Sequence, residues 1–166
     1  NLKNKFGIQT IVAINKYNHD TDKEISYLQE VLSKQNIEMS LIESWGKGSD
    51  GAIDLANKVI DLSDKQNDFK YAYELEDSIK DKVEKVCKNI YGAESVEFSE
   101  KATKMLETIE KLGYSNLPIC IAKTQYSFSD DPKNLECKEP FSIYIKELVL
   151  RAGAEFIVVM AGNILT

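Results

Sequence analysis

Apolar positions in the first part of the chain mark a strand followed by a helix. Residues 8–14 (IQTIVAI) are rich in β-branched side chains and apolar on both faces, which is typical of a strand buried in a parallel sheet. Over residues 25–32 the apolar side chains recur at helical spacing instead. Thr21 and Glu24 have the spacing of a capping box, so we expect this helix to begin at about Asp22.

The same order then repeats. Residues 37–42 (IEMSLI) predict a second strand, residues 43–49 a polar loop, and Ser49 or Asp50 the N-cap of a second helix. A strand–helix–strand–helix unit makes right-handed crossovers, which place its two strands parallel. Two parallel strands leave both sheet edges open, so we expect the remaining strands to come from chain that this sequence lacks.

The composition turns polar at residues 64–68, and we place a domain boundary there. Residues 1–66 are expected to be part of a parallel-sheet domain, and residues 67–166 a smaller α+β domain truncated at its C-terminus. For the smaller domain the pattern predicts a helix from Leu75 to a stop at Gly92 and a second helix capped by Ser99. Its strands are expected at residues 96–98, 117–124, 141–146 and 155–161. The predicted fold class is therefore α/β, with a partial βαβα sheet of the P-loop NTPase kind followed by the α+β domain.

The composition narrows the classes of function. The chain carries a net charge of −6, which argues against nucleic acid as a partner because nucleic-acid binders usually present a basic face. No apolar run approaches the ~18–20 residues of a membrane span, so we expect no membrane. Cys87, Cys120 and Cys137 lack CxxC spacing and are expected to be free thiols in a reducing cytoplasm, with Cys87 and Cys120 buried. His19 is the single histidine, so no metal site is predicted.

Two aromatic residues follow the two predicted parallel strands. Tyr17 comes after the first strand and Trp45 after the second, and the carboxyl ends of parallel strands open on the same edge of a sheet. Neighbouring strands lie ~5 Å apart, so a flat heterocycle could fit between the two rings. Two plainer interpretations stay open, in which Tyr17 packs on its own helix and Trp45 covers the sheet edge.

Three further loops are candidate binding sites. Asn15-Lys16 resembles the guanine-reading Asn-Lys-x-Asp loop of GTPases, but Asn18 stands where that loop needs Asp. The glycine-rich residues 46–51 precede a helix but do not match G-x-x-x-x-G-K-[ST], so we expect no triphosphate cradle. Residues 123–132 (KTQYSFSDDP) form a dense polar loop, which is either a turn stabilised by Asp and Ser side chains or a binding loop.

Several of these segments together resemble one enzyme family, formate–tetrahydrofolate ligase. The similarity runs in order along the chain, and its most specific part is AKTQYSFSDDP. The segments that carry it are AINKYNHDT (13–21), ESWGKGSDGAIDLA (43–56), KNIYGAESVEFS (88–99), LPICIAKTQYSFSDDP (117–132) and RAGAEFIVVMAGNILT (151–166). The family's proteins are much longer, and this sequence is similar to their C-terminal third. We therefore expect both of its ends to be cuts within a longer chain.

The resemblance implies an activity. The family joins formate to tetrahydrofolate at the expense of ATP, through formyl phosphate, and yields 10-formyltetrahydrofolate, ADP and phosphate. It further implies that ATP binds with Mg²⁺ at a phosphate loop upstream of residue 1, and that a monovalent cation is a possible further cofactor. The full-length protein is expected to be a cytoplasmic homotetramer. This piece alone is expected to be inactive.

The resemblance also implies site residues. The family places an aromatic side chain at the position of Tyr17 and a tryptophan at Trp45, with the pterin ring between them. Leu41 matches an apolar wall position, and Asn18 a contact in the same loop. Many members carry proline at the position of Asn18 and threonine at that of His19, so the chain departs from the family there.

Part of the site and of the function stays open at this point. The loop residues Lys123, Thr124 and Gln125 either contact substrate or pack against the nucleotide domain. For the whole chain two other functions remain: a non-catalytic interaction module on the same scaffold, or a fragment of a different P-loop ATPase.

Overall fold

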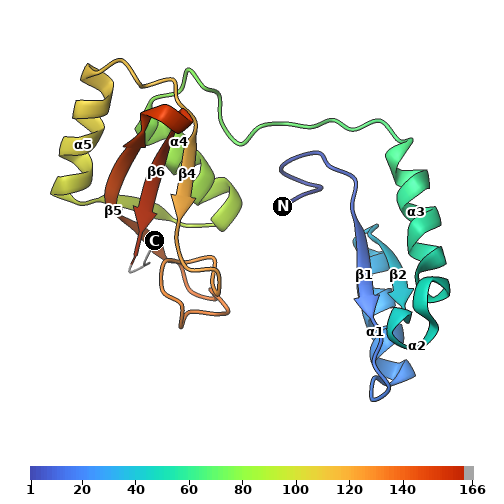
Figure 1. Ribbon diagram of the computed structural model, residues 1–166. Coiled ribbons are helices and arrows are strands. Elements are labelled where there is room, and N and C mark those ends of the chain that lie inside the picture. Colours follow the sequence, from blue (N-terminus) through green and yellow to red (C-terminus); the bar gives the residue numbers. More distant parts are fainter. Residues whose placement is uncertain (163–166) are drawn as a thin grey trace. The chain divides into compact units, whose positions relative to one another are not determined.

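The computed structural model describes residues 1–162, and the chain divides into two compact units, Asn1–Lys70 and Tyr71–Thr166 (Figure 1). Both units mix helices with strands, so the α/β class predicted from the sequence is confirmed at this level. The end of the last similar segment, residues 163–166, lies outside the described residues.

The first unit contains a two-stranded parallel sheet. Strand β1 (Ile11–Asn15) pairs with β2 (Glu38–Ile42), and the register runs without interruption from one end of the strands to the other. Helix α1 (Asp22–Lys34) connects the two strands, and α3 (Ile53–Ser63) follows β2. The predicted parallel βαβα order is therefore confirmed.

Strand β1 is shorter than the predicted run of residues 8–14. Residues 6–9 pair instead with the segment after α3: the carbonyl of Phe6 accepts from the Lys70 amide at 3.1 Å. The Gln9 amide donates to Asn67 Oδ1 at 3.2 Å. A Cβ at Gly7 would lie 1.9 Å from the Asp68 carbonyl oxygen, so only glycine permits this close approach.

Local side chains fix the start of α1 and the position of α3. Thr21 and Glu24 form the predicted capping box, in which Thr21 Oγ1 accepts from the Glu24 amide and Glu24 Oε2 accepts from the Thr21 amide. Ser40, buried in β2, donates to Asp54 Oδ2 at 2.6 Å, and Lys58 donates to the same oxygen at 2.8 Å. The Lys58–Asp54 bond lies within α3, whereas the Ser40 bond ties α3 to β2, and Lys58 Nζ adds a second tie by donating to the Met39 carbonyl at 2.7 Å.

The segment after β2 differs from the predicted loop. It coils into a short helix, α2 (Ser44–Lys47), and a 3₁₀ turn (Gly48–Ala52) before α3 begins. The expected N-cap at Ser49 or Asp50 is wrong, because Ala52 occupies that position and offers no capping side chain. The Glu43 amide donates to the Gly51 carbonyl at 3.0 Å, and a Cβ at Gly51 would lie 2.5 Å from the Glu43 carbonyl carbon. Because Glu43 and Gly51 lie this close together, the residues between them form helical turns and not an extended loop.

The second unit begins its first helix later than predicted. Helix α4 (Ile79–Val86) is capped by Ser78, whose side chain accepts from the Asp81 amide, and it continues into one π-helical turn (Cys87–Tyr91). Leu75 lies before the helix, because the Glu74 amide donates to Asp77 Oδ2 at 2.8 Å and closes a turn there. The predicted stop is confirmed, since Gly92 ends the helix in the left-handed region.

A four-stranded sheet forms the body of the second unit. Its strands are β3 (Ser95–Phe98), β4 (Ile119–Ala122), β5 (Ser142–Arg151) and β6 (Phe156–Ala161), in the order β3-β5-β6-β4. The pairs β3–β5 and β4–β6 are parallel, whereas β5–β6 is antiparallel. Helix α5 (Glu100–Lys111) is capped by Ser99 as predicted, and side chains of α4 and α5 join those of the strands in one core.

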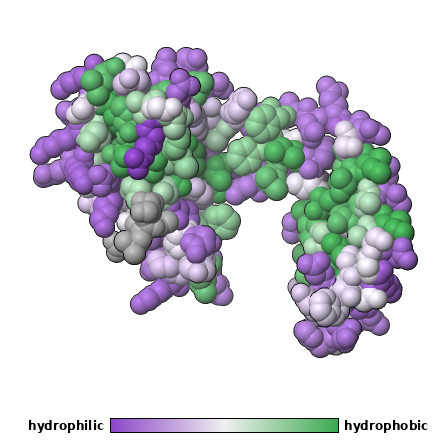
Figure 2. Space-filling model, viewed as in Figure 1, coloured by the Kyte–Doolittle hydropathy of each residue, from purple (hydrophilic) through white to green (hydrophobic). Residues whose placement is uncertain are grey.

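The two units differ in how much apolar surface they bury. All buried apolar side chains belong to the second unit; in residues 1–70 the only buried side chain is Ser40. Apolar side chains therefore reach the surface of the first unit, where they appear as green patches in Figure 2. No helix in the described part of the chain is long and apolar enough to cross a membrane.

The cysteines are all free thiols, but they differ in burial. Cys87 is buried as expected, and Cys137 is partly buried. The expectation for Cys120 is wrong, because this side chain is exposed. The reason is the alternation of side chains along β4: Ile119 and Ile121 pack against the core, so Cys120 between them points to the opposite face of this edge strand.

Candidate functional site

The carboxyl ends of β1 and β2 carry the two predicted aromatic residues. Because the strands are parallel and the Lys16 amide still donates to the Ile42 carbonyl at 2.9 Å, the segments that follow them lie at one sheet edge. Tyr17 is 57% exposed and Trp45 is 91% exposed. Neither ring is sealed in a core. Trp45 stands on the short helix α2 and not on a loop as predicted.

A cavity of about 430 Å³ lies between these two segments. That volume is within the range of small-molecule sites. The first segment contributes Lys16, Tyr17, Asn18 and Asp20 to its lining, and the second Glu43, Trp45, Gly46 and Lys47.

Three of the four predicted pterin residues, Tyr17, Asn18 and Trp45, are brought together in this cavity. Leu41 is not part of the lining; it lies half-buried in β2 opposite Ile14.

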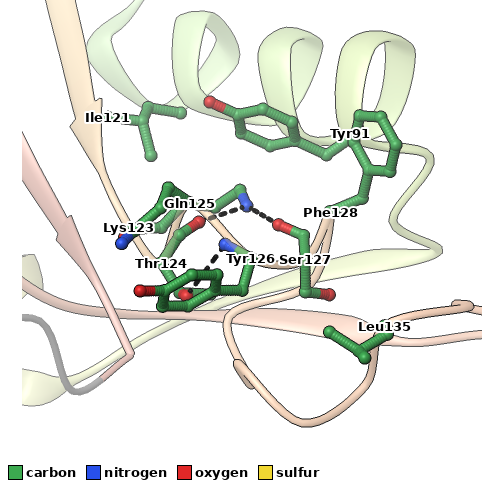
Figure 3. Close-up of a pocket in the computed structure, with 9 residues that line it drawn as sticks. All are labelled: Tyr91, Ile121, Lys123, Thr124, Gln125, Tyr126, Ser127, Phe128 and Leu135. Atoms are coloured by element: carbon green, nitrogen blue, oxygen red, sulfur yellow. Dashed lines mark hydrogen bonds between the residues drawn. The ribbon is translucent and has the colours of Figure 1, made fainter. Parts of the chain in front are cut away.

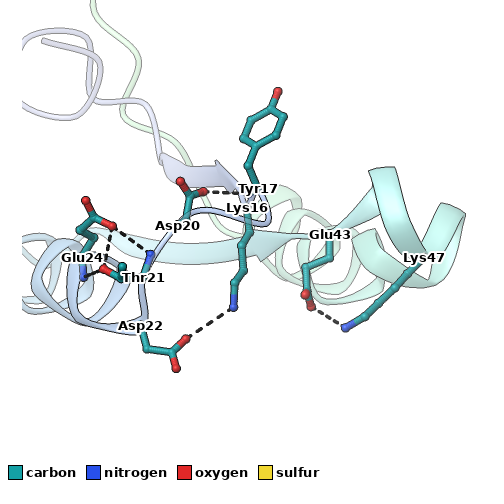
Figure 4. A network of polar contacts seen from close by, with 8 residues as sticks. All are labelled: Lys16, Tyr17, Asp20, Thr21, Asp22, Glu24, Glu43 and Lys47. Carbon is teal, nitrogen blue, oxygen red and sulfur yellow. Dashed lines mark hydrogen bonds and ion pairs between the residues drawn. The ribbon is translucent and has the colours of Figure 1, made fainter.

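A tight turn holds Tyr17 in place. The Tyr17 amide donates to Asp20 Oδ2 at 2.7 Å, and the Asp20 amide donates back to the Tyr17 carbonyl at 3.1 Å (Figure 4). Side-chain to backbone bonds of this kind fix turns. The Tyr17 ring and the Lys16 amine project in opposite directions from the chain in Figure 4, so the turn separates an aromatic side from a charged side.

The charged side consists of paired groups. Lys16 Nζ lies 3.6 Å from Asp22 Oδ1, and Lys47 Nζ lies 2.6 Å from Glu43 Oε2, one helical turn away. The hydrogen bond from Lys47 holds the pKa of Glu43 below its ordinary value, so this carboxylate stays ionised. Each lysine amine is thus paired with a carboxylate. The rim of the cavity is therefore polar and carries no large excess of positive or negative charge.

Some cavity residues were missed by the sequence analysis. Asp20, Glu43 and Lys47 were not predicted as site residues, yet all three line the cavity. The spacing of Asp20, three residues after Tyr17, is a turn signal that could have identified it. Glu43 and Lys47 come together only because α2 coils, which the sequence did not predict.

A second cavity, of about 410 Å³, lies beside the polar loop of the second unit (Figure 3). The predicted loop residues Lys123, Thr124 and Gln125 all line it, together with Tyr91, Ile121, Tyr126, Ser127, Phe128 and Leu135. Thr124 Oγ1 accepts from the Tyr126 amide at 3.3 Å, and Gln125 is exposed.

Lys123 organises this loop from within. Its Nζ donates to the carbonyls of Thr124 at 3.0 Å and Ser129 at 3.2 Å, and also to that of Ser127. It lies 4.8 Å from the centroid of the Tyr91 ring. Burial lowers the pKa of Lys123. The Lys123 amine is therefore bound by backbone carbonyls of its own loop and by the Tyr91 ring.

A metal ion requires several ligating side chains close together. Within residues 1–162, no group of three or more His, Cys, Asp and Glu side chains could hold a metal ion. We therefore assign no residue of the described chain to Mg²⁺ or to another cation.

Comparison with known proteins decides the family. The family model described as formate–tetrahydrofolate ligase matches residues 1–166. The chain belongs to the formate–tetrahydrofolate ligase family. The resemblance found in the sequence is thereby confirmed.

Individual formate–tetrahydrofolate ligases are similar over nearly the whole chain. The protein of that name from Limosilactobacillus reuteri subsp. reuteri (strain JCM 1112) is 46% identical over 162 residues, which cover 97% of this chain and 29% of the relative. Those from Campylobacter curvus (strain 525.92) and Campylobacter concisus (strain 13826) are 47% and 48% identical over 165 residues, 99% of this chain and 30% of each relative. The chain thus spans under a third of the length of these ligases.

Proposed function

We propose that this chain supplies the pterin-binding part of an ATP-dependent ligase that joins formate to tetrahydrofolate in the cytoplasm. The observation that carries the proposal is the shared cavity of Tyr17 and Trp45 at the carboxyl edge of two parallel strands. Relatives named formate–tetrahydrofolate ligase support the choice of ligand. The cavity alone would suit other flat heterocycles.

In this proposal the pterin lies between the two rings. An aromatic pair contributes ~0.5–1.5 kcal/mol beyond the burial of its area, so two rings orient a ligand and strengthen its binding moderately. Asn18 lines the same cavity and offers an amide to the polar edge of the pterin. Leu41 does not line the cavity, and its proposed role as an apolar wall rests only on the resemblance to the family.

The reaction proposed for the whole ligase has two steps. A formate oxygen attacks the γ-phosphorus of ATP, which gives formyl phosphate and ADP. N10 of tetrahydrofolate then attacks the formyl carbon and gives up its proton to solvent, and phosphate leaves with the electron pair of the broken C–O bond. Residues of this chain bind and orient the folate for the second step, in which positioning accounts for much of the rate.

ATP, Mg²⁺ and a monovalent cation have no assigned residues here. The sequence contains no G-x-x-x-x-G-K-[ST] motif, and we propose that these groups bind to parts of the ligase that the chain does not span. The two-stranded sheet would then belong to a larger P-loop NTPase-like sheet. The second unit would be a separate α+β domain, and the whole ligase a homotetramer.

Titration of the 166-residue chain with tetrahydrofolate tests this proposal. Trp45 is the only tryptophan and is exposed, so its emission should shift to shorter wavelength and be quenched when a pterin covers it. Tyr17→Ala should weaken binding by about tenfold, because one stacking partner and its buried area are lost. Trp45→Ala should lose affinity by a similar factor. Because this variant has no tryptophan fluorescence, its affinity is measured by calorimetry.

A matched control is available in the same unit. Tyr27 is an exposed tyrosine on α1 that does not line the cavity, so Tyr27→Ala should bind tetrahydrofolate as the unaltered chain does. Equal weakening by Tyr17→Ala and Tyr27→Ala would contradict the site. Binding of ATP with no response to tetrahydrofolate would favour the alternative of another P-loop ATPase.

A further inference from the structure

The single histidine stacks on Tyr17. The ring centroids of His19 and Tyr17 lie 5.9 Å apart with an interplanar angle of 20°. Tyr17, Asn18 and Asp20 line the cavity of the first unit, whereas His19 is not part of its lining. The side chain of His19 is 86% exposed. The imidazole therefore contacts the Tyr17 ring without forming part of the cavity lining.

One carboxylate anchors the turn from which both rings project. Asp20 Oδ2 accepts the hydrogen bond of the Tyr17 amide at 2.7 Å, and Asp20 Oδ1 lies 3.9 Å from His19 Nε2. The backbone of the turn is thus fixed by Asp20 and not by the imidazole. Removing the imidazole should leave the turn in place and withdraw only the ring contact.

We propose that His19 is a positioning residue for pterin binding: its imidazole holds the Tyr17 ring from behind, in the orientation that accepts the ligand. The order of the stack is then His19, Tyr17, pterin and Trp45. This inference rests on the proposed function.

The physical reason is the freedom of an exposed tyrosine. A ring that is 57% exposed samples several rotamers, and a ligand that fixes it must offset the lost side-chain entropy. A ring that is already stacked has lost part of this freedom before the ligand arrives. His19 thereby raises affinity without touching the ligand, and the effect should depend on Tyr17.

Stacking and charge can be separated by two substitutions. His19→Ala removes the ring, and tetrahydrofolate binding should weaken by about threefold. His19→Phe keeps a flat ring without a titratable group. Its affinity for tetrahydrofolate should therefore stay within about twofold of that of the unaltered chain. Lys23→Ala, at an exposed position in the first turn of α1, is the control and should leave binding unchanged.

Because His19 is the only histidine, its imidazole C–H signals in a ¹H–¹³C NMR spectrum need no assignment by mutation. In the free chain these signals should lie upfield of their positions in Tyr17→Ala, because the tyrosine ring current shields them. This measurement requires no folate and therefore tests the stack apart from the proposed function.

A double-mutant cycle links the stack to the ligand. The threefold loss caused by His19→Ala should vanish in the Tyr17→Ala background, because no ring is left to position. If the unaltered chain binds tetrahydrofolate and Tyr17→Ala weakens it while His19→Ala does not, the positioning role is overturned and the proposed function stands. If the chain does not bind tetrahydrofolate at all, both are overturned, even where the NMR shift reveals the stack.

Discussion

At the residue scale, two lysines of the second unit place their amines on backbone carbonyls. Lys82 is fully buried, and its Nζ donates to the carbonyls of Ser115 at 2.7 Å and Leu117 at 3.0 Å. Lys123 binds its own loop in the same way. Burial lowers the pKa of each amine. Both side chains cross-link segments of backbone that lack the regular bonds of a helix or strand.

The buried thiol of Cys87 should make stability fall at alkaline pH. Burial raises its pKa from 9.0 to about 12, since the thiolate is disfavoured in the core. Below pH 9 the thiol is protonated in both folded and unfolded chains, so the favourable contribution is complete there. Between pH 9 and 12 only the unfolded chain loses the proton, and the contribution is lost.

The loss should reach about 1 kcal/mol at pH 10, measured by urea unfolding of the second unit between pH 8 and 10. Cys87→Ala should flatten this slope, although the smaller side chain lowers stability at every pH. The exposed Cys120 offers the comparison, and Cys120→Ala should keep the slope. An unaltered slope in Cys87→Ala would show that the thiol does not titrate as stated.

At the scale of elements, the features predicted from the sequence are those set by neighbouring residues. The capping box of Thr21 and Glu24 and the cap at Ser99 act within one helical turn, so their spacing alone identified the helix starts. The coil after β2 depends on the close approach of Glu43 and Gly51, which lie eight positions apart and carry no local signal.

The candidate site divides in the same way. The parallel strands place Tyr17 and Trp45 at one edge, and this followed from the alternation of strands and helices. The ion pair of Glu43 with Lys47 depends on α2, and the stack of His19 on Tyr17 depends on a tight turn. These contacts require side-chain directions that a pattern of apolar and polar positions does not contain.

The loop of residues 123–132 should depend on Lys123. In Lys123→Met the carbonyls of Thr124, Ser127 and Ser129 lose their charged donor, and we expect the second unit to lose about 2 kcal/mol of unfolding free energy. The Tyr126 amide should exchange faster with solvent, as measured by hydrogen exchange. Lys133 is an exposed lysine just beyond this loop, so Lys133→Met should change neither quantity. Equal effects of the two substitutions would refute the cross-linking role of Lys123.

At the scale of the whole chain, the two units differ in the source of their stability. Among residues 71–162, the described part of the second unit, twelve apolar side chains are buried, which include Ile79, Ile109 and Leu148. The first unit holds its sheet and helices together with half-buried apolar residues and with polar links such as Ser40 to Asp54. Burial of apolar surface is the largest favourable term in folding, so the first unit should be much the weaker.

Amide hydrogen exchange should therefore be faster in residues up to Lys70 than in the core of the unit that begins at Tyr71. The amides of the β1–β2 pair should exchange at lower free energy of opening than those of the β5–β6 pair, because less apolar area is exposed when the first sheet opens. Ile109→Ala leaves a cavity in the second core and should cost about 2–4 kcal/mol of protection in β5 and β6. The same substitution should leave β1 and β2 unchanged if each unit opens by itself. A common loss of protection in all four strands would instead mean that the 166 residues unfold as one cooperative body, and that the first unit draws its stability from the second.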